Sequence, residues 1–170
     1  MSNEMFTSPE VILGFNSVGT PSDMTGKYEV NMFTTDSEFV NKLKNMDKEF
    51  YNKDGNSLNH RELNIIPARE KDVELIPGVT AEHFRIVARS KFAPTVVNTE
   101  GREITLSKNL PWGTKGTVSM TARSYAMKST KTAGTALYFN GLTMTSVPES
   151  NTETTNFQPA KKLDLSLDLN

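Results

Sequence analysis

Apolar and polar residues alternate with a period of two along much of the sequence, which is the spacing of half-buried β-strands. Residues 27–33, KYEVNMF, form one such stretch, and residues 84–92, FRIVARSKF, form another. In the second stretch the alternation predicts that Phe84, Ile86 and Phe92 face the core. Three basic side chains of this stretch face the opposite way: Arg85, Arg89 and Lys91.

A long hairpin is predicted at residues 116–144, where two alternating stretches flank a tip rich in lysine and hydroxyl groups. The alternation of the returning strand changes phase between Phe139 and Leu142. A β-bulge at residues 140–141 would keep the apolar side chains on both sides of it in the core. The pattern therefore predicts a bulged strand rather than two separate ones.

Shorter segments complete the predicted β structure. Apolar residues at 11–15 predict a first strand, and a turn at residues 98–101 predicts a hairpin. Residues 109–116 contain proline and glycine and indicate a connection. Residues 62–79 are mixed and charged, and we interpret them as an irregular connection with one short strand.

Helical spacing interrupts the β pattern once. Apolar residues recur at steps of three and four over residues 37–51, which predicts an amphipathic helix. Thr35 precedes Glu38 by three residues, the spacing of a capping box. Gly55 follows the helix and is available for a left-handed turn.

The order of elements favours a mainly β fold. Short antiparallel strands must protect their edges, so a small five-stranded antiparallel barrel with one inserted helix fits the pattern best. We expect this domain to span residues 1–147. Residues 148–170 lose apolar content at first and are interpreted as a flexible linker and C-terminal tail.

Charge is distributed unevenly along the chain, although the formal net charge is only −1. Residues 1–84 contain 8 basic and 14 acidic side chains, whereas residues 85–131 contain 9 basic and 2 acidic ones. Such a basic segment indicates either an anionic partner on one surface or solvated strand faces that carry lysine and arginine.

The sequence gives little support to catalysis. Cysteine is absent, which excludes disulfides and cysteine-ligated zinc. There is no glycine-rich phosphate loop and no serine nucleophile elbow, and His60 and His83 lie in polar surroundings. We interpret His60 as part of a solvated loop, and we expect neither an enzyme nor a cofactor. No apolar run approaches the length of a membrane span, so no membrane partner is expected.

The basic strands offer a better set of candidate residues, because cations can follow a phosphate backbone while aromatic rings stack on bases. Tyr125 lies two residues from Arg123, so both face outward from one strand. Trp112 either caps one end of the barrel or stands exposed in its loop, and Tyr138 faces outward. The candidate nucleic-acid-binding residues are Arg85, Arg89, Lys91, Arg102, Lys108, Trp112, Lys115, Arg123, Tyr125, Lys128, Lys131 and Tyr138.

The stretch GTKGTVSMTARSYAMKSTKTAGTALYFNGLTMTSV resembles the last hairpin of the single-stranded DNA-binding proteins of short-tailed, T-odd-type bacteriophages. Upstream, VVNTEGREI, FTSP and KYEVNMF fit the same family in the same order, so that the resemblance covers most of residues 6–147. It implies an oligonucleotide/oligosaccharide-binding (OB) fold. It also implies binding of single-stranded DNA, without strong sequence preference, during phage DNA replication, recombination or repair in the cytoplasm of the infected bacterial host.

The C-terminal tail departs from this family, whose members end in a long acidic tail with a terminal aromatic. Here Asp164 and Asp168 alternate with four leucines, Leu163, Leu165, Leu167 and Leu169. That alternation suggests a strand that adds to a sheet edge and supports a homo-oligomer, most simply a dimer. The alternative is a short tail that binds replication proteins.

Two other functions fit the same sequence. A virion structural or decoration protein would also be small and rich in β structure, but it has no need of the clustered positive charge. An RNA-binding OB module would show the same pattern of cations and aromatic rings.

Overall fold

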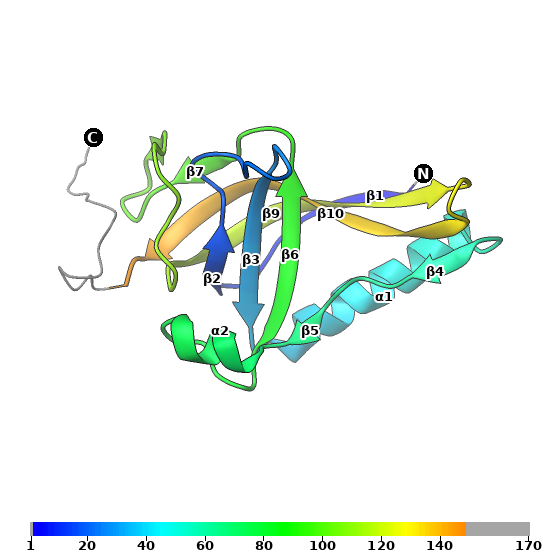
Figure 1. Ribbon diagram of the computed structural model, residues 1–170, viewed down its shortest axis with the longest axis horizontal. Helices are drawn as coiled ribbons and strands as arrows, with labels where there is room; N and C mark the ends of the chain where they lie inside the picture. The colour runs from blue at the N-terminus through cyan, green and yellow to red at the C-terminus, as the bar shows by residue number, and fades with distance from the viewer. Residues whose placement is uncertain (1, 149–170) are drawn as a thin grey trace.

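Five strands of the computed structural model pair into a closed ring, in the order β9, β2, β3, β6, β10 and back to β9 (Figure 1). The structure describes residues 2–148, so the four alternating leucines of the predicted tail lie outside the described residues. The ring strands are β2 (Val11–Asn16), β3 (Tyr28–Thr34), β6 (Phe84–Ser90), β9 (Lys115–Met127) and β10 (Thr132–Ser146).

The inward side chains of the ring form the main hydrophobic core. Val30, Met32, Ile86 and Met120 are fully buried there, as the alternation predicts. The predicted bulge is confirmed, because the register between β9 and β10 shifts between Phe139 and Gly141. Apolar residues on both sides of the shift are consequently buried: Leu137, Phe139, Leu142 and Met144.

The ring departs from the predicted all-antiparallel barrel in one respect. It is closed by a parallel contact between β10 and β6, in which Tyr138 pairs with Arg89. Strand β10 also pairs in parallel with β4 (Asn59–Arg61) and with β7 (Thr95–Val97). Pairings of this kind depend on long-range contacts that leave no local pattern in the sequence.

Peripheral elements extend the ring beyond what the sequence predicts. A strand missing from our prediction, β1 (Asn3–Thr7), pairs with β9, and β8 (Glu103–Ile104) forms the predicted hairpin with β7. The segment predicted to be mostly irregular contains a short strand and a second helix, namely β5 (Ile66–Pro67) and α2 (Glu70–Leu75). The prediction of a single helix is therefore wrong.

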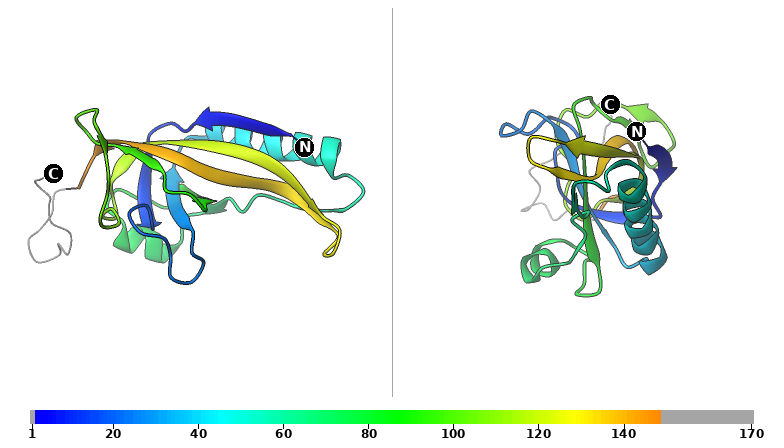
Figure 2. Two further views of the ribbon diagram at one scale, coloured as in Figure 1. Left: turned by 90° about the horizontal axis from the view of Figure 1, so that it is seen from above. Right: turned by 90° about the vertical axis from the view of Figure 1, so that its right-hand side faces the viewer.

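The predicted helix is α1 (Ser37–Asp54), which lies alongside the β9–β10 hairpin where this hairpin extends beyond the ring (Figure 2). Its cap is Asp36, whose carboxylate accepts a hydrogen bond from the Phe39 backbone N–H, and not the predicted Thr35. Gly55 has a φ of −136°, so it does not make the predicted left-handed turn. A Cβ there would lie 2.4 Å from the Cβ of Ala133, so glycine lets the helix end approach β10.

The N-terminal strand is tied to the end of α1. The Asp54 carboxylate accepts hydrogen bonds from the Ser124 hydroxyl, at 2.7 Å, and from the Ser2 backbone N–H, at 2.7 Å. These bonds lower the pKa of Asp54 to about 2. The carboxylate therefore stays ionised well into acid, and the stability that this contact contributes is lost as the pH falls from about 4 toward 2.

A buried carboxylate joins α1 to two other elements. Asp47 accepts hydrogen bonds from the Thr135 hydroxyl on β10 and from the Leu63 backbone N–H after β4. The His60 ring contacts the same carboxylate at 3.1 Å and stacks on Tyr51 at 4.3 Å between centroids. His60 is thus half-buried in a packed contact, and the prediction of a solvated loop is wrong.

Among the helices of the described residues, neither is long and apolar enough to cross a membrane.

Candidate nucleic-acid interface

A groove of about 730 Å³ crosses the outer face of the ring. One wall is the outward face of the β9–β10 hairpin, and the other consists of β6, the residues just after it and the segment 61–65 that follows β4. The period of two in β6 helps to explain this arrangement, because Arg85, Val87 and Arg89, which alternate with the core residues Ile86 and Ala88, all line the groove.

Positive charge dominates the groove. The basic residues that line it are Lys27, Arg61, Arg85, Arg89, Lys91 and Arg123. Glu62 is the one acidic residue among the described lining residues. Such a groove attracts a polyanion along its whole length.

Two tyrosines of the hairpin lie in the groove among these cations. Tyr125 faces Gly134 on the neighbouring strand, and a Cβ at Gly134 would come within 3.0 Å of the Tyr125 hydroxyl oxygen. The tyrosine ring therefore lies across the hairpin at a position where only glycine leaves room. The Arg123 guanidinium lies 5.5 Å from the centroid of the Tyr138 ring, a cation–π contact at the surface.

The arginines of β6 differ in how their charge is compensated. Arg89 donates a hydrogen bond to the Glu29 carboxylate at 2.9 Å. Arg85 donates to the side-chain oxygen of Asn31 at 2.9 Å, and its buried Nε atom has no hydrogen-bond partner among the described residues. Burial, followed by the nearby charge of Arg69, lowers the pKa of Arg85. A guanidinium in this situation is stabilised by an added anion.

The groove brings together half of the candidate residues. Those lining it are Arg85, Arg89, Lys91, Arg123, Tyr125 and Tyr138. The other six lie outside the groove: Arg102, Lys108, Trp112, Lys115, Lys128 and Lys131. The part of all twelve residues in binding stays a prediction. Lys128 and Lys131 flank the tip of the hairpin, beyond the groove.

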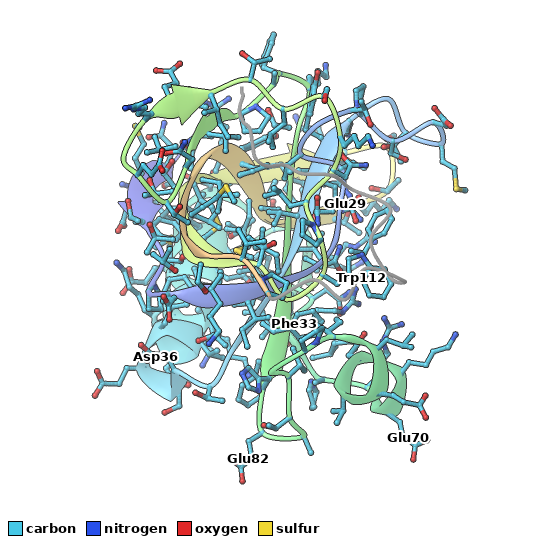
Figure 3. All side chains as sticks on the ribbon, turned by 90° about the vertical axis from the view of Figure 1, so that its left-hand side faces the viewer. Glu29, Phe33, Asp36, Glu70, Glu82 and Trp112 are labelled. Atoms are coloured by element: carbon cyan, nitrogen blue, oxygen red, sulfur yellow. The ribbon has the colours of Figure 1, made fainter. Side chains whose placement is uncertain are left out.

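Trp112 lies in the loop before β9 and is 41% exposed, so it does not close the ring as a buried lid. It lines a second cavity of about 170 Å³ together with Phe33 and residues of α2. Figure 3 labels Trp112 and Phe33 on the side of the ring above α2.

Three basic or aromatic residues of the groove were not among the candidates from the sequence. Phe92 was expected in the core, but it is 79% exposed and lines the groove. Strand β6 ends at Ser90, so the parity of the strand no longer applies two residues later. Arg61 reaches the groove through the parallel pairing of β4 with β10, and Lys27 through the start of β3. Both residues lie outside the basic segment 85–131, so the distribution of charge along the sequence did not indicate them.

The described residues contain no group of three or more His, Cys, Asp or Glu side chains that could hold a metal ion. His83 accepts a hydrogen bond from the Thr80 backbone N–H, and burial lowers its pKa. What the groove offers chemically is cationic and aromatic contact with a ligand.

The fold is similar to solved structures of bacteriophage single-stranded DNA-binding proteins. The single-stranded DNA-binding protein gp2.5 of bacteriophage T7 matches with a TM-score of 0.62 and 12% identity, over 91% of this chain and 98% of that chain. The single-stranded DNA-binding protein of bacteriophage Enc34 matches with a TM-score of 0.59 and 16% identity, over 88% of each chain. The same protein in complex with single-stranded DNA matches equally well, over 85% of this chain.

No protein-family model matches the sequence, and no curated protein matches it significantly. The likeness is therefore one of fold, and it confirms the mainly β, OB-like architecture expected from the sequence.

Proposed function

We propose that this protein, which has the fold of the phage single-stranded DNA-binding proteins, binds single-stranded DNA in the groove without strong sequence preference. The observation that carries the proposal is the lining of the groove, where six cations and three exposed or half-exposed aromatic rings converge on one face. Cations hold a phosphate backbone of any sequence, and bases of every kind stack on aromatic rings.

The arrangement favours a single strand over a duplex. Tyr125, Tyr138 and Phe92 point into a concave groove, where an unpaired base can reach them. Bases within a duplex are already stacked and paired, so their faces are not available to these rings. The solved complex of the Enc34 protein with single-stranded DNA, which has the same fold, supports this choice of ligand.

A direct test compares three labelled ligands by fluorescence anisotropy at one salt concentration: a single-stranded DNA, the same sequence as a duplex, and the same sequence as RNA. We expect the single-stranded DNA to bind much more tightly than the duplex. Equal affinity for the single strand and the duplex would contradict the proposal. Tighter binding of the RNA would favour an RNA-binding module.

Binding is expected to weaken steeply with salt. For single strands the slope of log affinity against log salt concentration is about −0.7 per phosphate neutralised, so four to six contacts give roughly −3 to −4. The groove cations are the source of these contacts. The affinity for an oligothymidylate, measured at four or more salt concentrations, gives the slope. Tight binding with a slope near zero would exclude a cationic groove as the binding site.

Replacing Tyr125 with alanine is expected to weaken single-strand binding by about 1–3 kcal/mol, the usual contribution of one stacked base. The ring is half-exposed and outside the core, so the melting temperature should change little. Titration with an oligothymidylate and thermal unfolding provide the two measurements. Val147→Ala removes an exposed apolar side chain away from the groove and serves as the control. A large fall in melting temperature with unchanged affinity would show that Tyr125 stabilises the fold and does not contact the DNA.

The proposal extends to the biological setting. A protein of this kind would coat single strands during phage DNA replication, recombination or repair, in the cytoplasm of the infected bacterium. This setting is supported by the phage origin of the proteins with the same fold. We further propose a homodimer, for which the alternation of leucine and aspartate at residues 163–169 is the support, with contacts of this tail to replication proteins as the alternative.

A further inference from the structure

Three arginines lie near one another in a row that leads away from the groove. Arg89 and Arg85 both line the groove, Arg85 lies four residues before Arg89 near the start of β6, and Arg69 precedes α2. Burial lowers the pKa of Arg85 most, and the like charges of Arg69 and Arg89 lower it further, so both of these guanidinium groups lie within electrostatic reach of Arg85. Mutual repulsion of this kind is relieved when an anion binds among them.

Two of the three guanidinium groups bond directly to carboxylates, whereas the middle one, Arg85, has no direct ion pair among the described residues. Arg69 forms two hydrogen bonds with the Asp72 carboxylate, and Arg89 bonds to Glu29. Arg85 contacts the neutral Asn31 side chain, while no residue in the described part of the chain bonds to its buried Nε atom. Among the three arginines, Arg85, which lines the groove, is therefore the one that a bound anion would stabilise most.

The second cavity begins where this row ends. Its polar lining residues are Asn31, Arg69, Lys71 and Asp72, the ion-pair partner of Arg69, and its apolar lining residues include Phe15 and Trp112. Phe15 is 50% exposed and Trp112 is 41% exposed, so two large aromatic faces are open to solvent beside two cations. An exposed aromatic pair with adjacent positive charge fits a base and its phosphate.

The groove and the cavity are joined by hydrogen bonds through one residue. Asn31 accepts from Arg85, which lines the groove, and donates to the backbone oxygen of Phe15, which lines the cavity. A strand that leaves the groove at Arg85 consequently meets the aromatic pair next.

We propose that the bound strand continues past the groove over Arg85 and places a further base against Trp112 and Phe15 in the second cavity. Arg85 contacts the intervening phosphate, and Arg69 and Lys71 contact the phosphate of the added base. This extension rests on the proposed function, and it lengthens the site without changing the ligand. It also gives Trp112 a role separate from that of Tyr125.

The test is a comparison of two oligothymidylates, of about 4 and about 16 nucleotides, which bracket the usual site size of an OB domain. Trp112→Ala in the full chain should lower the affinity for the long oligonucleotide by roughly 5- to 150-fold, the loss of one stacked base. The affinity for the short one, which the groove alone accommodates, should stay unchanged. Trp112→Phe should recover much of the loss, because it keeps an aromatic face.

Two control variants separate the possible failures. Tyr125→Ala should lower the affinity for both oligonucleotides. Met24→Ala, which alters an exposed side chain that lines neither the groove nor the second cavity, should lower neither affinity. If Trp112→Ala lowered the affinity for both oligonucleotides equally, the proposed extension would be overturned, since Trp112 would then act through the groove or through the stability of the fold. Unchanged affinity of Trp112→Ala for both oligonucleotides would also overturn the extension, and the second cavity would then be a site for another ligand, such as a peptide. Failure of the unaltered protein to bind either length would overturn the proposed function itself.

Discussion

Replacing Phe139 with alanine is expected to lower the free energy of unfolding by about 3–5 kcal/mol. The ring is 1% exposed and lies in the main core, on the strand that pairs with more neighbours than any other in the described chain. Its removal leaves a cavity among fully buried side chains such as Met120 and Leu142, and a packed core collapses only partly around such a gap. Domains of this size have a total stability of about 5–15 kcal/mol, so much of it would be lost.

The matched control for this variant is Phe92→Ala, which deletes the same ring at a position that is 79% exposed. Urea unfolding followed by circular dichroism should give a midpoint well below that of the unaltered protein for Phe139→Ala. The midpoint for Phe92→Ala should stay close to that of the unaltered protein. Similar losses from the two substitutions would mean that Phe92 is packed against the core, as the sequence pattern had predicted.

The features that the sequence predicts correctly are those whose signal is local. The bulge beside Phe139 follows from a change of phase within one strand, and the structure has its register shift at that point. The helix follows from apolar steps of three and four, and it begins at the expected Ser37. The outward direction of Arg123 follows from strand parity, and this side chain is exposed. Each of these inferences requires only residues that are neighbours along the chain.

The features that the sequence misses depend on contacts between distant segments. Strand β1 shows little apolar alternation, because it is an edge strand whose residues are mostly exposed, and it is recognised only by its pairing with β9. The parallel pairing of β4 with β10 carries Arg61 to the groove, although nothing near Arg61 indicates a strand. Phe92 was misplaced because the alternation of residues 84–92 continues beyond the point where β6 ends.

A buried carboxylate provides the link between stability and the groove. Asp47 is 3% exposed and accepts hydrogen bonds from Thr135 and from the Leu63 backbone N–H, and it also contacts His60. Leu63 and Thr135 both line the groove, the first from the segment after β4 and the second from β10. One side chain of α1 therefore anchors two of the segments that line the proposed binding site.

Replacing Asp47 with alanine is expected to lower the free energy of unfolding by about 2–4 kcal/mol, because buried donors that lose a charged acceptor remain unsatisfied. The same change should weaken single-strand binding, since the segment after β4 loses its anchor to the helix. Urea unfolding measures the first effect. Amide hydrogen exchange at Leu63 and titration with an oligothymidylate measure the second. Glu49→Ala, at an exposed position on the same helix, is the control and should change neither quantity.

A second substitution tests whether the stability lost in Asp47→Ala comes from the hydrogen bond between Asp47 and Thr135. Thr135→Val removes one of the donors, so its cost should be smaller when Asp47 is already alanine, and the two losses should not add. Additive losses would mean that the hydrogen bond between these side chains contributes nothing to stability. Unaltered exchange at Leu63 in Asp47→Ala, together with unaltered affinity, would show that the groove wall is held by other contacts. Faster exchange at Leu63 with weaker binding is the outcome that follows if this carboxylate positions the wall.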